Sequence, residues 1–414
     1  MIIAAALVTI SLLFEVVVRP IIPRLHLGAE YYCIGLSLAD GRGFSDAFGE
    51  ATGPTAWMPP IYPAFLGLVI KLVGTKNGVA GCIAVLMAVS VAIQGVSVHA
   101  IASRCFRKIS PWVATGIFFV WVLTFHYWFF ELTSDVWLLC LVVNCTTLAA
   151  VHHVVSGEVK VLAWGALGGI GALISPTLAF AWGCLVLFFA ARQAANRARW
   201  ARVLLVGACI VLPWTVRNAV VFDKFIPTKS NLMFEAYQAN VMDEDGIYDV
   251  SSMVTHPYNS LKVRFEYQKL GEIGFIARHG ARFRNQLAAN PAGFLRRIAN
   301  RAVAATVRYV PISERMDPPF ERRLIDLLYP IPFVCMLLSL WMNGPQRALL
   351  RVLSFFWCCY LLPYVVVAFY VRYYLPLTPL MVTSIGLTID QCAALYAQRR
   401  ERAASGPVVA EGQT

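Results

Sequence analysis

The sequence predicts an all-α polytopic membrane protein with about ten transmembrane helices. Composition is the first reason: 58% of the 414 residues are apolar or aromatic and only 14% are charged, whereas soluble domains carry about 25% charged residues. The mean hydropathy of +0.64 agrees with this. The second reason is that the apolar residues fall in long runs, and the third is that short basic clusters separate those runs.

A helix that crosses a bilayer needs about 20 mostly apolar residues. The runs that meet or approach this length are residues 2–18, 78–103, 111–130, 136–155, 160–174, 175–191, 203–221, 326–342, 349–369 and 374–396. The fifth and sixth runs are short and meet at Ser175-Pro176, which predicts a tight hairpin or a kinked pair. The first run lacks a basic leader and a clear cleavage site, so we expect a retained helix. Residues 1–402 then form one transmembrane domain, and residues 403–414 form a disordered cytoplasmic tail.

The charged residues of the short loops predict the orientation. The loops on one side hold thirteen basic residues: Arg104, Arg107, Lys108, Lys160, Arg192, Arg197, Arg199, Arg202, Arg347, Arg351, Arg399, Arg400 and Arg402. Only two acids, Glu158 and Glu401, lie among them. Because Lys and Arg accumulate in cytoplasmic loops, we expect both termini inside, in a bacterial inner membrane. Since the bases are spread among apolar runs, the net charge of +12 does not indicate nucleic-acid binding.

Two outer segments, residues 19–75 and 222–325, are too long to be simple turns. The first contains an expected juxtamembrane helix at 29–38, which ends at Gly41. It also contains an apolar run at 62–73 that is too short to span and is expected to lie along the interface or re-enter the membrane.

The second outer segment contains two amphipathic stretches, residues 275–287 and 291–310. In the first of them, Phe275, His279 and Phe283 recur every four residues, with arginines on other faces. Basic amphipathic helices lie on anionic head groups, so we expect both stretches to contact membrane lipids.

Several unusual residues map to the same outer face although they lie far apart in the sequence. They are Glu30, the proline-rich run from Gly53 to Pro63 with Trp57, Pro60 and Tyr62, Asp135, Arg217, Asn218 and Arg372. Two carboxylates, a rigid platform and arginines at one membrane surface suggest a site for an anionic lipid-linked substrate. Arginine neutralises the phosphate that leaves a glycosyl phosphate, and a carboxylate takes the proton of the attacking group. No ligand spacing requires a metal or another cofactor, although a divalent metal stays open.

At these positions the sequence resembles the GT-C-type membrane glycosyltransferases, a group that includes protein O-mannosyltransferases and lipid A aminoarabinose transferases. The matching motifs cover nearly the whole chain: Glu30-Tyr31, Gly41-Arg42-Gly43-Phe44-Ser45, Thr55 through Pro63, Thr133-Ser134-Asp135, Leu212 through Asn218, Asn290-Pro291 and Arg372 through Pro376. The resemblance implies transfer of a sugar from a polyprenyl-phosphate donor to a glycan, lipid or protein acceptor on the outer face. The catalytic residues it implies are Glu30 and Asp135. The substrate-binding residues it implies are Trp57, Pro60, Tyr62, Arg217, Asn218 and Arg372.

One departure from the family pattern concerns the acid of the first outer helix. Many members carry an Asp four residues before the tyrosine that aligns with Tyr31, and this chain has Leu27 there. Glu30 lies about one helical turn later, so it is the candidate catalytic base in place of that Asp. Glu131, one turn before Asp135, is the alternative second acid.

Simpler interpretations of these residues stay open at this stage. Acids often mark the ends of spans, arginines there can extend to the head groups, and aromatic residues anchor helices at the interface. A different function, transport of a solute or flipping of a lipid, would favour charged residues near the middle of the spans. The carboxylates within the expected spans, Glu15 and Asp390, both lie near span ends. The sequence therefore favours glycosyl transfer over transport.

Overall fold

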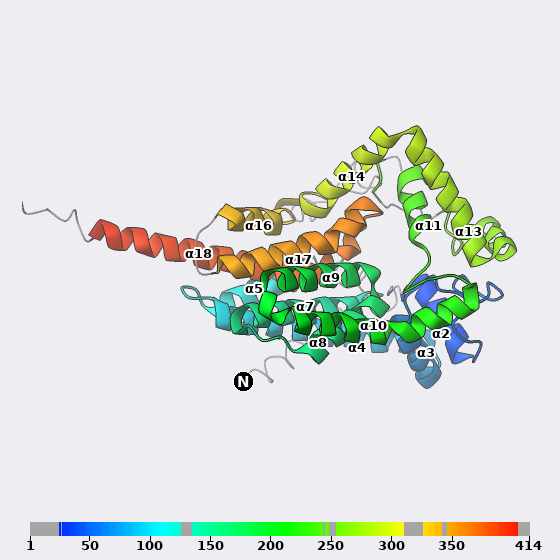
Figure 1. Ribbon diagram of the computed structural model, residues 1–414, viewed down its shortest axis with the longest axis horizontal. Helices are drawn as coiled ribbons and strands as arrows, with labels where there is room; N and C mark the ends of the chain where they lie inside the picture. Colours follow the sequence, from blue (N-terminus) through cyan, green and yellow to red (C-terminus); the bar gives the residue numbers. More distant parts are fainter. Residues whose placement is uncertain are drawn as a thin grey trace, which may run out of the picture.

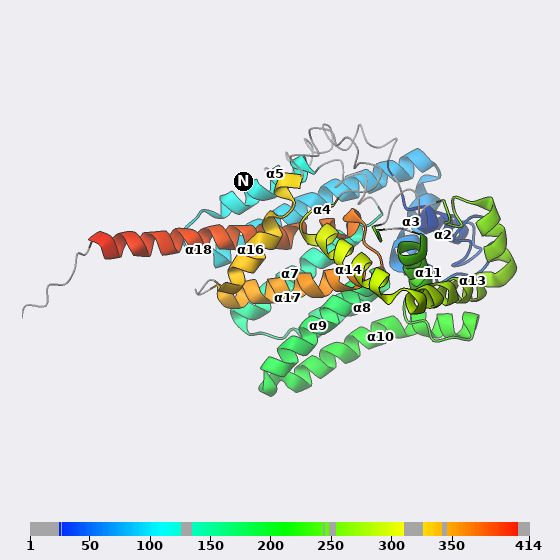
Figure 2. The same ribbon diagram turned by 90° about the horizontal axis from the view of Figure 1, so that it is seen from above.

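The computed structural model describes residues 25, 27–125, 135–242, 245–247, 254–309, 326–341 and 346–404. These residues form helices and loops, with no strand among them. The helix α18 (Thr378–Ala404) projects from one end of the bundle, whereas α2 (Ala29–Ala39), α3 (Ile61–Val73) and α13 (Leu261–Ala289) gather at the other end (Figures 1 and 2). We call these the α18 end and the site end.

The helices are of the membrane type that the sequence predicts. Among the described residues, five helices are long and apolar enough to cross a membrane: α4 (Lys76–Cys105), α7 (Trp137–Ser156), α10 (Arg197–Phe222), α17 (Arg347–Val366) and α18. Shorter apolar helices are α3, α5 (Pro111–Thr124), α8 (Val161–Ile174), α9 (Pro176–Arg192) and the stretch Asp326–Leu338, which overlaps α16 (Ile331–Trp341). The count of ten spans is not confirmed. The expected span at residues 2–18 and most of the expected tail lie outside the described residues.

Local sequence explains where two of these helices begin. The hydroxyl of Thr75 accepts a hydrogen bond from the amide of Gly78 (3.2 Å), so Thr75 is the N-cap of α4. The hydroxyl of Ser110 accepts one from the amide of Trp112 (3.4 Å), and Pro111 takes the first position of α5. Such caps satisfy amides that have no partner within the helix, and proline has the helical φ already.

Glycines on α8 let three helices pack closely. A methyl group on Gly165 would lie 2.5 Å from Val206 of α10, and one on Gly169 would lie 2.6 Å from Ile210. The equal spacing of these pairs shows that α8 and α10 run parallel at a distance that only small residues permit. Trp182 of α9 donates its indole N–H to the carbonyl of α8 Trp164 (3.0 Å). The helices α8 and α9 therefore form the hairpin alternative predicted at Ser175-Pro176.

At the site end, the two outer segments share a hydrophobic core of their own. The helices α2 and α3 cross where a methyl group on Gly35 would lie 3.0 Å from Leu66. The core joins residues of the first segment to residues of α11 (Leu232–Tyr237) and α13: Ile34, Phe48, Trp57, Phe234, Tyr267 and Phe275. Aromatic edge-to-face pairs, such as Phe48 on Tyr267 at 4.8 Å between ring centroids, contribute to it.

The amphipathic stretches of the second segment form α13, which is kinked at Gly271, and α14 (Pro291–Thr306). Their inward faces contact protein. His279 is buried against Phe234 and Phe275. Arg301 is fully buried and donates to the carbonyls of Val365 (2.7 Å) and Val366 (2.9 Å) at the end of α17. The expectation that the arginines of α14 face lipid head groups is therefore wrong for Arg301, because these carbonyls have lost their partners within α17.

Candidate functional site

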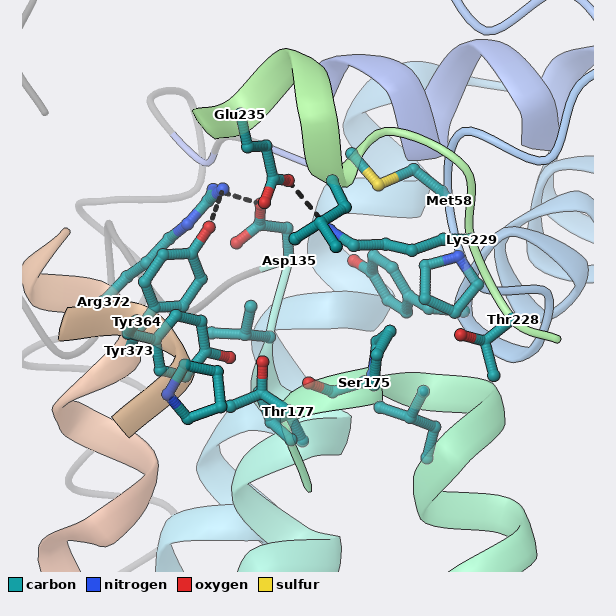
Figure 3. Close-up of a pocket in the computed structure, with 18 of the residues that line it drawn as sticks. Met58, Asp135, Ser175, Thr177, Thr228, Lys229, Glu235, Tyr364, Arg372 and Tyr373 are labelled. Atoms are coloured by element: carbon teal, nitrogen blue, oxygen red, sulfur yellow. Dashed lines mark hydrogen bonds and ion pairs between the residues drawn. The ribbon is translucent and has the colours of Figure 1, made fainter. Parts of the chain in front are cut away.

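A cavity of about 400 Å³ opens at the site end of the bundle, and we call it the main cavity. Its walls come from the first outer segment, the start of α7, the α8–α9 hairpin, the start of the second outer segment and the segment that precedes α18. Figure 3 shows the polar side chains that point into it: Asp135, Ser175, Thr177, Thr228, Lys229, Glu235, Tyr364, Arg372 and Tyr373. Residues separated by more than two hundred positions in the sequence thus line one site.

An ion pair links the second predicted acid to a predicted arginine. The Nη1 group of Arg372 donates to Oδ2 of Asp135 (2.8 Å), and Nη2 donates to the hydroxyl of Tyr373 (3.2 Å). Asp135 is buried, and it lies against the beginning of α2, because a methyl group on Gly28 would be 2.9 Å from its Cβ. Gly28 also has a φ of 77°, which a side chain would strain. Glycine at this position therefore lets α2 begin directly beside Asp135.

A second ion pair in the main cavity was not among the residues expected from the sequence. The ammonium group of Lys229 donates to Oε1 of Glu235 (2.8 Å), which also accepts from the amide of Asn231 (3.0 Å). Burial alone would lower the pKa of Lys229, but the negative charge of Glu235 raises it above its usual value. Among its described lining residues, the main cavity therefore holds two cations and two carboxylates arranged as two pairs (Figure 3).

Glu30 lies beside an adjoining cavity of about 140 Å³, the side cavity. Its carboxylate accepts from Nε2 of His256 (3.2 Å), and Nδ1 of His256 accepts from the amide of Tyr258 (3.3 Å). These contacts assign the ring proton to Nε2. Burial alone would raise the pKa of Glu30, but the hydrogen bond that it accepts from His256 lowers the pKa below its usual value. Glu30 is therefore ionised at neutral pH.

The two cavities share part of their lining. Met58, Asp135, Glu235, Arg372 and Tyr373 line both. The structure thus brings the two predicted acids, Glu30 and Asp135, to one side cavity and places the Asp135–Arg372 pair between it and the main cavity. Glu131, the alternative acid, lies outside the described residues.

The three residues predicted from the proline-rich run, Trp57, Pro60 and Tyr62, differ in the cavity that they line. Trp57 lines the side cavity inside the aromatic core, and its indole N–H makes no hydrogen bond within the described residues. Tyr62 lines the main cavity and packs edge to face on Tyr31, with 5.0 Å between the ring centroids. Pro60 is the residue that precedes α3 and lines neither of these two cavities, although its neighbour Pro59 lines the main one.

Arg217 and Asn218 line neither of these two cavities. The guanidinium of Arg217 donates to the carbonyls of Thr55 (2.7 Å) and Phe44 (2.9 Å) in the first outer segment. The amide of Asn218 donates to the carbonyl of Ile226 (2.9 Å). Arg217 therefore contacts the backbone of the proline-rich run at Thr55 and does not line either cavity.

A buried carboxylate of α13 holds the same run from the other side. Glu272 accepts hydrogen bonds from the hydroxyl of Thr55, the amide of Ala56 (2.9 Å), and the hydroxyls of Ser230 (2.7 Å) and Tyr267 (2.9 Å). Four donors satisfy this carboxylate, and no cation of the described part of the chain is in direct contact with it. Arg217 and Glu272 together hold the proline-rich run in place, and this run positions Trp57 at the side cavity.

Sequence reasoning missed Lys229, Glu235 and His256. Lys229 lies among small polar residues, where no periodic pattern marks it. Glu235 had a signal, because it is the one acid in the short apolar stretch of α11. His256 had none, because its pairing with Glu30 depends on a fold that joins segments more than two hundred residues apart. Within the described residues, no group of three His, Cys, Asp or Glu side chains is arranged to hold a metal ion.

Comparison with known proteins assigns no relative to this arrangement. No protein-family model, no curated protein and no solved structure matches the chain. The functional interpretation therefore depends on the residues and the geometry of the chain itself.

Proposed function

We propose that this chain is an integral membrane glycosyltransferase that takes a sugar from a polyprenyl-phosphate carrier at the site end and transfers it to an envelope glycan, lipid or protein. The observation that carries the proposal is the main cavity, in which Arg372 and Lys229 stand with Asp135 and Glu235 beside apolar helices. The motifs that resemble GT-C-type glycosyltransferases support it as well.

The lining of the cavities suits the parts of such a donor. Leu139, Ile174 and Phe180 provide an apolar wall for an isoprenoid chain. Arg372 and Lys229 provide the cations that a phosphate needs, and arginine binds phosphate through two parallel hydrogen bonds. The side cavity, with its carboxylates and its aromatic wall, offers a sugar the hydroxyl partners and ring faces that carbohydrates require.

Binding of the donor would also activate a base. Arg372 is paired to Asp135 and Lys229 to Glu235, each at 2.8 Å. A phosphate that binds both cations competes with these carboxylates and so weakens the pairing of Arg372 with Asp135. Asp135 then takes the proton of the acceptor hydroxyl or amine while the acceptor atom bonds to the anomeric carbon. The bond from that carbon to the phosphate oxygen breaks, and the phosphate keeps the electron pair.

Glu30 suits a different task from the one first expected. Because the pKa of its carboxyl group is held below the usual value, Glu30 is a weak base at neutral pH. A fixed negative charge beside the sugar stabilises an oxocarbenium-like centre, as carboxylates do in glycosidases. We therefore assign proton transfer to Asp135 and stabilisation of the cationic sugar to Glu30.

The proposal predicts transfer of labelled sugar by the purified, reconstituted chain from at least one member of a panel of polyprenyl-phosphate hexoses and pentoses. Asp135→Asn should lower kcat by about 10²–10⁴-fold, the usual contribution of a general base. Arg372→Gln should mainly weaken donor binding, because the phosphate loses a charge-assisted partner. Glu50→Gln is the matched control, because this carboxylate of the same segment is 87% exposed.

Two outcomes would contradict the proposal. Normal turnover in Asp135→Asn would remove that residue as the base. Uptake of a solute into proteoliposomes, with no transfer from any donor of the panel, would favour the transporter alternative instead.

A further inference from the structure

A third cavity lies at the α18 end, opposite the proposed active site. Its volume is about 500 Å³, and the ends of α7, α9 and α17 form it. The ends of α9 and α17 lie on the side of the bundle from which α18 projects (Figure 2). We call it the arginine cavity, because Arg192, Arg347 and Arg351 line it, and no Asp or Glu is among its described lining residues.

Two of these arginines, Arg347 and Arg351, lie where their own helix makes a cation unfavourable. Arg347 and Arg351 lie one turn apart at the beginning of α17, so their side chains share a face. The beginning of a helix carries a partial positive charge, which makes cations unfavourable there and anions favourable. Gln346, the N-cap of α17, makes no side-chain cap and binds Cys105 and Asp390 instead. The amides at this end and the two guanidinium groups thus add to one positive field.

Apolar side chains lie beside these charges. Phe188 and Val352 line the cavity, and the guanidinium of Arg192 lies over the ring of Phe188 at 4.7 Å from its centroid. His153 closes the inner wall with both ring nitrogens engaged, one with the carbonyl of Glu158 (2.8 Å) and the other with Gln193 (3.0 Å). A cavity that joins cations to an apolar wall at the ends of membrane-type helices fits an amphipathic anion better than a free one.

We propose that the arginine cavity binds the phosphate-bearing head group of an anionic membrane lipid, with the acyl chains along α9 and α17. This site lies apart from the cavities assigned to sugar transfer, and it faces the side that the loop charges predict to be cytoplasmic. If these arginines reflected only the accumulation of basic residues on the cytoplasmic side, we would expect them to be spread over several loops. Here three of them, from two helices distant in the sequence, converge on one cavity.

The test is lipid retention by the delipidated full-length chain, measured by native mass spectrometry with added phosphatidylglycerol. The double variant Arg347→Gln/Arg351→Gln should bind this lipid with a Kd at least about tenfold higher than that of the unsubstituted chain. The reason is that each arginine near an anionic head group adds to the binding free energy, and two arginines are removed. The control Arg104→Gln/Arg107→Gln removes the same charge from exposed positions at the same end and should bind as the unsubstituted chain does. The charge-preserving variant Arg347→Lys/Arg351→Lys should retain most of the binding.

Further measurements distinguish a lipid head group from free phosphate, and a second variant serves if the first does not fold. Phosphatidylcholine should not be retained, and excess inorganic phosphate should not displace phosphatidylglycerol. If the double variant does not fold, Arg351→Gln alone serves, because this side chain is exposed. Equal loss of lipid in both double variants, equal retention of phosphatidylcholine, or displacement by inorganic phosphate would each overturn the proposal.

Discussion

Arg217 illustrates the difference between the position of a residue in the sequence and its contacts in the fold. Its place near the outer end of α10 favoured a phosphate contact, but its guanidinium binds the carbonyls of Thr55 and Phe44. It also lies over the ring of Trp214 at 5.0 Å from the centroid. These contacts fasten the second half of the chain to the proline-rich run that forms the cavity wall.

We therefore expect Arg217→Ala to lower stability more than donor affinity in the assembled protein. Hydrogen bonds to a charged donor contribute about 1.5–3 kcal/mol, so the apparent melting temperature in detergent should fall clearly. Arg202→Ala, which removes an exposed arginine from the other end of the same helix, should leave it nearly unchanged. A donor Kd that rises strongly at unchanged melting temperature would instead favour the phosphate contact first expected.

At the scale of elements, the α8–α9–α10 unit depends on close approach between helices. Gly165 and Gly169 of α8 leave no space toward α10, so any added atom must push the helices apart or distort a side chain. In contrast, Gly183 of α9 has no neighbouring atom within 4 Å of the position of a Cβ. Gly169 and Gly183 therefore allow the same substitution, glycine to alanine, to be compared at a crowded and at an open position.

Gly169→Ala should destabilise the protein by about 1–3 kcal/mol, the usual result of overpacking. Gly183→Ala should be neutral or slightly stabilising, because alanine is the better helix former. Thermal unfolding of both variants in the same detergent measures the difference. Equal melting temperatures would show that α10 moves away from α8 without loss.

At the scale of the whole molecule, the predicted orientation is testable with exposed positions from each end. Glu50→Cys and Lys269→Cys should react with a membrane-impermeant maleimide in intact cells, because both lie in the segments predicted to be outside. Ala195→Cys should react only after permeabilisation. The unsubstituted chain gives the background from its own cysteines. Reaction at position 195 in intact cells, with 50 and 269 protected, would invert the topology.

The sequence by itself determined the helical, membrane-type character of this protein and the approximate positions of most helices. Hydropathy and loop charge are local properties, so runs such as those at α4, α7 and α17 can be read directly. The break at Ser175-Pro176 was also local, because a proline there interrupts the apolar run. Glu30, Asp135 and Arg372 each stand out from their own surroundings in the sequence, and the three line one side cavity.

Only the tertiary structure decided which charges are paired and which of them face a cavity. The partner of Glu30 is His256, the partner of Arg372 is Asp135, and Arg301 is buried among carbonyls. Each of these contacts joins segments separated by tens to hundreds of residues, and no local pattern specifies them. A charged side chain at a helix end has the same sequence signature whether it meets solvent, lipid or protein. Packing between distant segments selects among these, since a buried charge must find its partner there.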